Sequence, residues 1–360
     1  MAFSAGELAN IANAALDFYI KGDALAQSIQ DKPLMDMLMK KSKTFPGGKG
    51  EISIPVKGDY TTALEGFAHN DTVSYANPAN IKRAVASWYE LHAGISLTLT
   101  ELKHDGISVV DSNTSGEVTQ HSQGELTRLT SLLDDKLDDM TQGWANTFND
   151  MIWADGTQDA KEVPGIQALI TSTATSGIAP ATGTIHGLNR ATFDWWRNRS
   201  ATLAAKKTSA ATNGGVLLQF LQNEIRQLRR YGGRPDIAVC GSDFMNALET
   251  ELRANGNYTQ TGFSGAQDVG VGAVKFAGLT FVYDPTMDGL NINSVGAGSG
   301  SKYCYILDSK HIKLYVMDGE DLKQHTPSRP ADQYVMYRAV TWTGGLMCDQ
   351  LNCHGVYSIA

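Results

Sequence analysis

Several features of enzymes, secreted proteins and membrane proteins are scarce or missing in this sequence. The 360 residues include four cysteines and no C-x-x-C pair; the cysteines are Cys240, Cys304, Cys348 and Cys353. A disulfide framework is not expected in a chain of this size, and the thiols suit a reducing compartment. No basic leader precedes an apolar run, and no apolar stretch approaches membrane-spanning length. We therefore expect a soluble protein, made inside the cell, that keeps its N-terminus from Met1.

Motifs for catalysis and nucleotide binding are missing too. The sequence has no H-E-x-x-H, no G-x-S-x-G, no P-loop and no G-x-G-x-x-G. Cys348, Cys353 and His354 come nearest to a metal site, but we expect them on one alternating strand, which sends close neighbours to opposite faces. We predict no catalytic residues, no cofactor, no metal and no enzyme activity. A hydrolase that uses scattered His and Asp residues is the alternative from another class.

Positive charge is in deficit, because the net charge is −8 and the sequence pI is about 5.5. A general attraction to nucleic acid is not expected, so any DNA contact must come from a local patch. Lys40, Lys41 and Lys43 form the patch that we predict to face DNA. Arg229 and Arg230, near the expected end of a helix, complement the helix dipole and are further candidates for contact with a neighbouring copy.

One segment has a strong helical pattern. Between 125 and 153, large apolar residues recur at three- and four-residue steps: Leu126, Leu129, Leu133, Leu137, Met140, Trp144, Phe148 and Ile152. This spacing predicts an amphipathic helix about 40 Å long.

A long excursion without a core pattern precedes that helix. Strand-like alternation occurs at 52–56 and again at 93–100, and the residues between are rich in Asn, Asp, Gly and Thr. Loops of this length in compact domains are usually functional or disordered. If the loop were free in water, its apolar and aromatic residues would be exposed; they are Tyr60, Leu64, Phe67 and Tyr75. We therefore predict an ordered hairpin that these four residues bury against another subunit.

The rest of the chain mixes helices and strands without a regular alternation. Helices are expected at 3–22, from Pro33, after Asn213 up to Gly232, and from Ser242. Strands are expected at 237–240, 274–284, 303–308, 311–317, 334–343 and 346–359. This pattern is typical of an α+β fold rather than a doubly wound sheet.

A pair of tryptophans is followed directly by charge. Trp195 and Trp196 precede Arg197, and aromatic residues together with Arg are enriched at the centres of interfaces. Core packing is one reading of the pair. Contact with a neighbouring subunit through Trp195, Trp196 and Arg197 is the other.

Taken in order, these segments resemble the major capsid proteins of tailed bacteriophages, which have the Hong Kong 97 type fold. The resemblance spans nearly the whole chain and depends on order and spacing more than on any one motif. The matching segments are the excursion at 47–100, the long helix, VPGIQALI at 163–170, FDWWRN at 193–198, the helix–Gly-Gly–RPDI junction ending at 237, VKFAGLT at 274–280 running into Asp284-Pro285, and YCYILD at 303–308.

The resemblance implies a domain plan. An N-arm would cover 1–46 and an extended E-loop 47–100. A peripheral domain with the spine helix at about 125–153 would cover 101–215, and an axial domain 216–329. The strands of 330–360 would return to the peripheral domain.

The resemblance also implies function and partners. The protein would self-assemble into hexamers and pentamers of an icosahedral virion shell that encloses double-stranded DNA, after synthesis in the bacterial host cytoplasm. A portal, a separate scaffold protein and a decoration protein would be further partners, the packaged DNA would be bound without sequence preference, and no membrane would be involved. Lys49 and Lys57 lie in the E-loop, but nothing identifies a cross-linking partner, so no covalent cross-link is expected. An encapsulin-like bacterial compartment of the same fold is the closer alternative.

Overall fold

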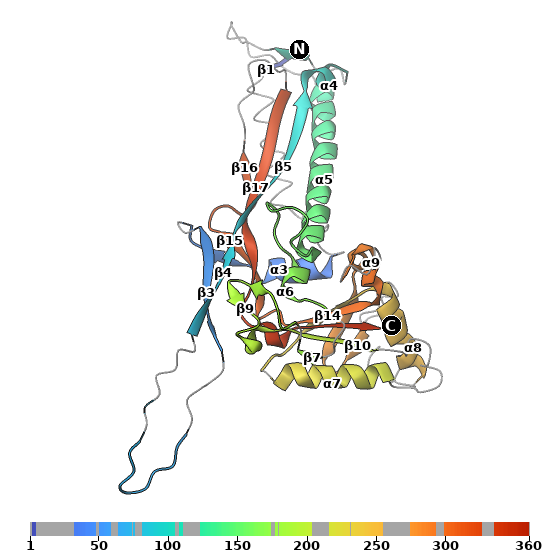
Figure 1. The fold of residues 1–360 in the computed structure, drawn as a ribbon. Helices are drawn as coiled ribbons and strands as arrows, with labels where there is room; N and C mark the ends of the chain where they lie inside the picture. Colours follow the sequence, from blue (N-terminus) through green and yellow to red (C-terminus); the bar gives the residue numbers. More distant parts are fainter. Residues whose placement is uncertain are drawn as a thin grey trace.

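A long arm and a compact sheet region make up the part of the chain that the structure describes. The computed structural model describes residues 2–4, 32–47, 50–58, 64–73, 75, 81–104, 108–110, 123–173, 177–178, 180–203, 216–230, 232–254, 274–292, 299–325 and 335–359. The N-terminus lies at the far end of the arm, and the C-terminus lies in the sheet region (Figure 1). A thin hairpin projects from the place where the two parts meet.

The compact region contains a seven-stranded sheet. Its order is β12-β13-β11-β14-β18-β10-β7. The bounds are β7 (Gly177–Ile178), β10 (Arg199–Leu203), β11 (Ile237–Cys240), β12 (Val274–Phe276), β13 (Leu279–Tyr283), β14 (Tyr303–Leu307) and β18 (Gly355–Ile359). The pairs β10–β18 and β11–β13 are parallel, and the remaining neighbours are antiparallel. This mixed sheet confirms the α+β prediction.

Helices α7 (Val216–Arg230) and α8 (Ser242–Ala254) belong to the same region. The buried side chains of α7 recur at helical spacing and join the core under the sheet: Leu217, Leu218, Leu221, Ile225 and Leu228. Gly232 then takes φ +83°, a conformation that side chains other than glycine rarely adopt, and its N–H bonds the Arg229 carbonyl at 3.0 Å. The predicted helix and its glycine ending are confirmed.

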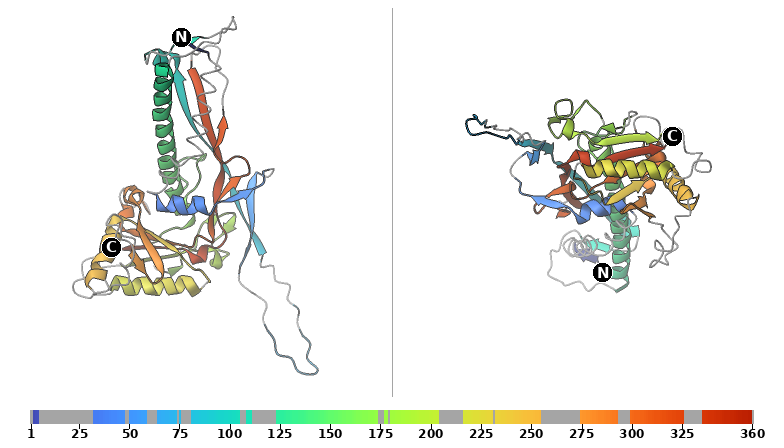
Figure 2. Two further views of the ribbon diagram at one scale, coloured as in Figure 1. Left: turned by 180° about the vertical axis from the view of Figure 1, so that it is seen from behind. Right: turned by 90° about the horizontal axis from the view of Figure 1, so that it is seen from below.

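The arm is built on a second sheet of five strands. Its centre is β17 (Val335–Cys348), which pairs antiparallel with every residue of β5 (Tyr89–Thr98). The other strands are β2 (Lys43–Phe45), β15 (Ile312–Met317) and β16 (Lys323–His325). Helix α5 (Gln123–Trp153) runs along β5 and β17, as Figures 1 and 2 show. Its 31 residues span about 46 Å.

Aromatic packing fixes α5 to this sheet. Phe148 stacks on Trp144 with ring centroids 4.8 Å apart and meets Trp342 of β17 edge-on at 5.0 Å. Ile152 and Trp153 are fully buried at the end of the helix. The predicted spine helix is therefore confirmed.

Shorter elements complete the described chain. Helix α3 (Pro33–Lys40) begins at Pro33, as the sequence predicts. The remaining elements are β1 (Ala2–Ser4), β3 (Glu51–Lys57), β4 (Ile81–Ser87), β6 (Ser108–Val110), β8 (Thr184–Ile185), β9 (Leu188–Asn189), α4 (Leu99–His104), α6 (Ile166–Leu169), α9 (Pro285–Gly289), η1 (Asp194–Trp196), η2 (Ser299–Lys302) and η3 (Leu351–Cys353). Among the described residues, no helix combines the length and the apolar character needed to cross a membrane.

Several of the predicted elements differ from the structure. The strand predicted at 274–284 is two strands, β12 and β13, which pair antiparallel across a turn. Residues 2–4, the start of the predicted helix at 3–22, form β1, which pairs with β6, and 5–31 lie outside the described residues. The predicted strand at 346–359 is wrong, because β17 ends at Cys348 and the 3-10 helix η3 separates it from β18. A turn at this point redirects the side chains that alternation would have placed.

The sheets also cross the predicted domain boundaries. β10, from the segment 101–215, and β18, from the last segment, both join the seven-stranded sheet. β15, from the segment 216–329, joins the arm. Among the described residues of the last segment, β17 lies in the arm and β18 in the seven-stranded sheet.

Candidate assembly surfaces

The projecting hairpin consists of β3 and β4, which pair antiparallel from Glu51–Ser87 to Lys57–Ile81. Ile52, Val56 and Ala84 are buried at its root and belong to the main core. The far limb predicted at 93–100 is wrong, since residues 93–98 lie in β5 and pair with β17, and α4 begins at Leu99. The described residues 64–73 lie far from the body, as both side views show (Figures 1 and 2).

Large apolar side chains lie at the tip of this hairpin. Leu64 is 102% exposed, Tyr75 is 94% exposed and Phe67 is 74% exposed. Tyr60, the fourth residue of the predicted contact, lies outside the described residues. Each such side chain gains roughly 1.5–3 kcal/mol when it is moved from water into an apolar contact. Apolar residues gathered on a projecting loop are typical of an interaction surface.

The two adjacent tryptophans at the root differ in exposure. Trp196 is fully buried, and its indole Nε1 donates to the Ile185 carbonyl at 3.1 Å. The expectation that Trp196 contacts a neighbour is therefore wrong. Trp195 is partly exposed and packs against Phe193, with ring centroids 5.5 Å apart. Trp195 also packs against Gly58 at the hairpin root. The approach is so close that a Cβ built on Gly58 would lie 2.6 Å from Trp195 Cε2.

The arginines named by the sequence have different surroundings. Arg197 is partly buried, and its Nε donates to the Arg190 carbonyl at 2.7 Å. Arg229 is exposed, yet it donates to the Ala277 carbonyl at 2.9 Å. Arg230 is exposed at the end of α7. Arg229 and Arg230 lie at the end of α7, whereas Arg197 directly follows the tryptophans of η1.

A buried arginine that the sequence analysis did not single out, Arg190, holds together the loops at the hairpin root by hydrogen bonds. Arg190 is 2% exposed and donates to the Leu169 carbonyl at 2.6 Å, to Thr171 Oγ1 at 3.0 Å and to Asn198 Oδ1 at 3.3 Å. Burial, helped by the nearby charge of Arg197, lowers the pKa of Arg190 to about 10. This network fixes the loop that carries the tryptophans. Nothing in the local sequence separates Arg190 from a surface arginine.

The three lysines predicted to face DNA are not equivalent. Lys40 pairs with Asp36 one helical turn away at 2.6 Å. Lys41 pairs with Asp236, a residue far along the chain, at 3.2 Å. Lys43 is exposed on β2. The charge of Lys41 is therefore partly offset inside the molecule.

The sequence and the fold both match capsid proteins. The family model described as SU10 major capsid protein matches residues 100–359. The chain belongs to the SU10 major capsid protein family. Accordingly, it is a capsid protein of a virion and associates with itself to form the shell. No curated protein matches the chain.

Solved capsid structures share the fold of this family member. The capsid asymmetric unit of cyanophage A-1(L) matches with a TM-score of 0.60 and 15% identity, over 91% of this chain and 92% of that chain. The capsid of a native GTA particle gives 0.55 and 13%, over 90% of each chain. Gordonia phage Cozz gives 0.52 and 12%, over 90% of this chain and 86% of that chain. The chain has the Hong Kong 97 type fold that the sequence predicts.

Proposed function

We propose that this SU10-family capsid protein assembles into hexamers and pentamers of an icosahedral shell around double-stranded DNA. The hairpin tip lies on a neighbouring subunit in this proposal. The observation that carries the proposal is the exposure of Leu64, Phe67 and Tyr75 on a ribbon whose described residues contact the body only at the root. Neither an encapsulin-like compartment nor a hydrolase is favoured for a member of this family.

The energetics suit stepwise assembly. Complete burial of three such side chains contributes on the order of 4–9 kcal/mol before the cost of ordering the loop and joining two subunits is subtracted. One contact of this size is weak. In a closed shell every copy both offers a hairpin and receives one, so modest contacts are multiplied by symmetry.

Other surfaces take supporting roles in the proposal. Trp195 and Arg197 lie beside the hairpin root and would form the rim of the same contact, while Arg229 and Arg230 would meet a second neighbour. Lys40 and Lys43 would face the packaged DNA, and Lys41 would serve mainly its own ion pair. The shell would be made in the host cytoplasm with a separate scaffold and a portal, and a decoration protein would bind its outside.

A triple substitution tests the hairpin. In the variant with Leu64→Ser, Phe67→Ser and Tyr75→Ser, we expect folded subunits and shell yield at least tenfold lower by electron microscopy and size-exclusion chromatography. The control carries His69→Ser, Asn70→Ser and Thr72→Ser, three polar changes in the same exposed loop. The control should assemble normally. Normal shells from the variant that replaces Leu64, Phe67 and Tyr75 would overturn the proposed contact.

A further inference from the structure

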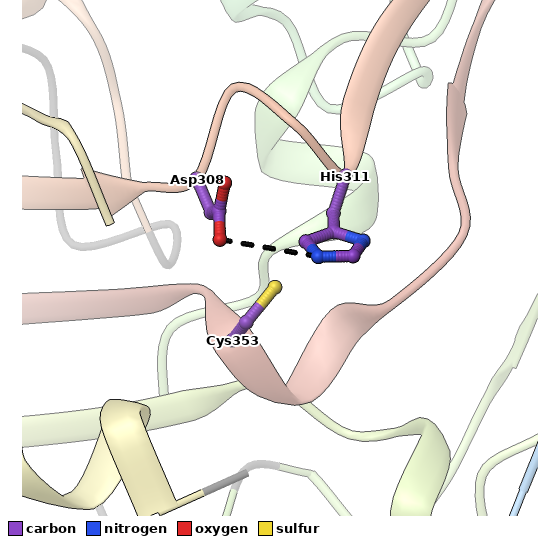
Figure 3. Close-up of side chains that lie close together, drawn as sticks. All are labelled: Asp308, His311 and Cys353. Carbon is purple, nitrogen blue, oxygen red and sulfur yellow. Dashed lines mark ion pairs between the residues drawn. The ribbon is translucent and has the colours of Figure 1, made fainter. Parts of the chain in front are cut away.

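Four chain segments meet where the two sheets exchange strands. Asp308 directly follows β14, and His311 directly precedes β15. Asp349 directly follows β17, and Cys353 ends η3, just before β18. β14 and β18 belong to the seven-stranded sheet, whereas β15 and β17 belong to the arm. The chain therefore passes twice between the two sheets at one place (Figure 3).

Three of these residues bring metal-binding atoms together. The Asp308 carboxylate, a ring nitrogen of His311 and Cys353 Sγ all lie within 4.8 Å of one another. His311 Nε2 lies 4.0 Å from Asp308 Oδ2. A tetrahedral zinc ion, with bonds of about 2.0–2.3 Å, spaces its ligand atoms roughly 3.3–3.8 Å apart. Small side-chain rotations, which close the cluster by about 1 Å, would therefore suffice.

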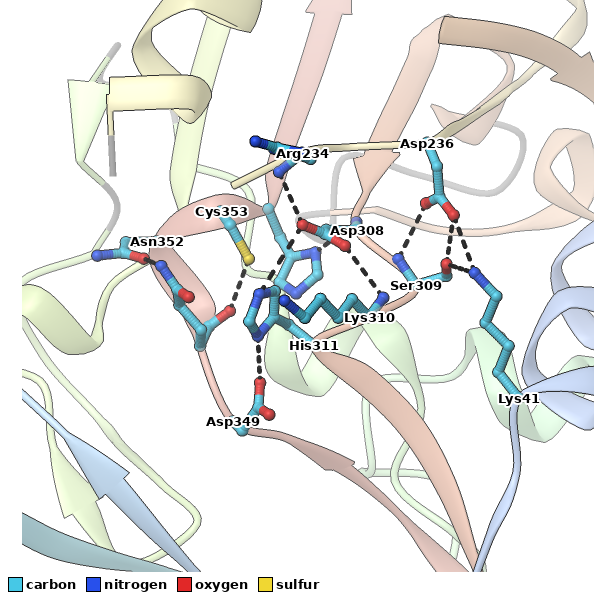
Figure 4. Close-up of polar contacts among 12 residues, drawn as sticks. Lys41, Arg234, Asp236, Asp308, Ser309, Lys310, His311, Asp349, Asn352 and Cys353 are labelled. Carbon is cyan, nitrogen blue, oxygen red and sulfur yellow. Dashed lines mark hydrogen bonds and ion pairs between the residues drawn. The ribbon is translucent and has the colours of Figure 1, made fainter. Parts of the chain in front are cut away.

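The imidazole is held in the orientation that a metal ligand needs. His311 Nδ1 lies 2.7 Å from Asp349 Oδ1, on the side of the ring away from Asp308 (Figure 4). When Nδ1 donates its proton to this carboxylate, the lone pair of the neutral ring is on Nε2, which faces Asp308 and Cys353. Metal-bound histidines typically have such a carboxylate behind them.

The carboxylate of Asp308 is also fixed in place. Its Oδ2 accepts from the Arg234 N–H at 2.8 Å and its Oδ1 from the Lys310 N–H at 3.0 Å. Each oxygen has two lone pairs, so Oδ2 keeps one for a metal. Cys353 Sγ donates to the Gln350 carbonyl at 3.0 Å. Asp308 and Cys353 are nearly or fully buried, and His311 is partly exposed.

We propose that Asp308, His311 and Cys353 bind a Zn²⁺ ion, with Asp349 as the residue that positions His311. A thiolate, an imidazole and a carboxylate form a donor set that suits zinc. His311 and Asp349 also line a cavity of about 450 Å³ beside the hairpin root. A water molecule would supply the fourth ligand. On binding, the Cys353 S–H bond breaks, the Zn–S bond forms, and the proton passes to solvent.

The position of the ion gives it a structural role. Its three ligands come from the ends of β14, β15 and η3, so the ion would connect the arm to the compact sheet. The same cavity is lined by Val56 and Gly58 of the hairpin and by Trp195. Zinc would therefore stabilise the junction from which the hairpin projects. A ligand that binds only the folded state raises the free energy of unfolding, and the increase grows with its free concentration.

Zinc content tests the proposal directly. Purified protein is stripped with a chelator, dialysed, incubated with ZnCl₂ and freed of unbound ion, and zinc is then counted by mass spectrometry. We expect one zinc per subunit and a higher melting temperature with zinc than after chelation. His311→Ala and Cys353→Ser should each lower the affinity at least tenfold. Asp349→Ala should weaken binding about 10- to 100-fold, because it removes the acceptor that orients His311.

His92→Ala is the matched control, since His92 is an exposed histidine on β5, away from the cluster. It should bind zinc as the unchanged protein does. Cobalt supplies a second readout that does not depend on stability: bound Co²⁺ should show thiolate charge-transfer absorption, and Cys353→Ser should abolish it. Substoichiometric zinc in the unchanged protein, or equal zinc in the ligand variants, would overturn the proposal and leave a His–Asp hydrogen-bond network.

Discussion

The indole Nε1 of Trp153 donates a hydrogen bond of 3.0 Å to Oδ2 of Asp284. Trp153 is the last residue of α5, and Asp284 is the N-cap of α9 in the compact region. The other oxygen, Oδ1, accepts from the Thr286 N–H at 2.9 Å. Burial raises the pKa of Asp284, and both hydrogen bonds oppose that shift. The Asp284 carboxylate therefore connects the spine helix α5 to the sheet region and also caps the N-terminus of α9.

Asp284→Ala should lower the free energy of unfolding by about 2–4 kcal/mol. Loss of the N-cap costs about 1 kcal/mol, and leaving the buried indole N–H of Trp153 without an acceptor costs about 1–3 kcal/mol. Asp284→Asn should cost less, because the amide oxygen still accepts and Asn is a good N-cap. Urea denaturation followed by tryptophan fluorescence measures both changes.

Asp318→Ala provides the control, because Asp318 is an exposed aspartate in the turn after β15. It should change the free energy of unfolding by less than about 0.5 kcal/mol. Equal losses for Asp284→Ala and Asp318→Ala would show that the bond between Trp153 and Asp284 contributes nothing measurable.

A second prediction concerns the hairpin root. Gly58→Ala places a Cβ 2.6 Å from Trp195 Cε2, closer than real Cβ contacts. Either the indole or the strand must move, and we expect the hairpin to leave the body at a changed angle. Subunits should fold, while the yield of closed shells falls at least several-fold. Electron microscopy of purified assemblies gives the yield.

Gly66→Ala is the matched control, because a Cβ at Gly66 meets nothing within 4 Å. It makes the same chemical change in the same loop and should assemble normally. Adding Trp195→Ala to Gly58→Ala should restore part of the yield, since it removes the clash. A Gly58→Ala variant that assembles like Gly66→Ala would argue against a fixed exit angle.

Periodicity predicted the long elements well and the pairing poorly. The apolar spacing of α5 and α7 is a local property, so the sequence alone locates both helices. Strand alternation also marks 52–56 and 93–98 correctly as strand, although the last two residues of the predicted strand, 99 and 100, begin α4. It cannot say which strand is the partner, because any two alternating segments satisfy the same pattern. Alternation therefore predicts β5 as the second strand of the hairpin, whereas β3 in fact pairs with β4.

Side-chain placement at turns was harder still. Trp195 and Trp196 are chemically identical neighbours, and only the 3-10 turn η1 decides that Trp196 enters the core. The alternating pattern predicts that Cys353 lies on a continuous strand, but η3 turns it toward Asp308 and His311. Such clusters join residues from distant parts of the chain, and no local spacing rule detects them.

The third prediction concerns acid stability and His186. This residue has φ +48°, its carbonyl accepts from the Val85 N–H of β4 at 2.8 Å, and its Nε2 is buried with no hydrogen-bond partner among the described residues. Burial lowers the pKa of His186 to about 4. Below the pKa of about 6.5 that histidine has in the unfolded chain, His186 is protonated in the unfolded state but stays neutral in the folded state. The contribution of His186 to the free energy of unfolding is therefore fully present above pH 6.5. As the pH falls from 6.5 toward 4, the free energy of unfolding decreases by about 3 kcal/mol.

His186→Asn removes this titration while keeping a residue that tolerates positive φ. At pH 7.5 the variant should be the less stable protein, because it leaves a small cavity. As the pH falls to 4.5, the gap in the free energy of unfolding should narrow by up to about 3 kcal/mol, since only the original protein loses the histidine contribution. Urea denaturation at each pH, in one assembly state, measures the gap. For the control His92→Asn, at an exposed histidine, the free energy of unfolding should depend on pH as it does in the original protein. If the curve for His186→Asn were also parallel to that of the original protein, His186 would take up its proton equally well in the folded and the unfolded state.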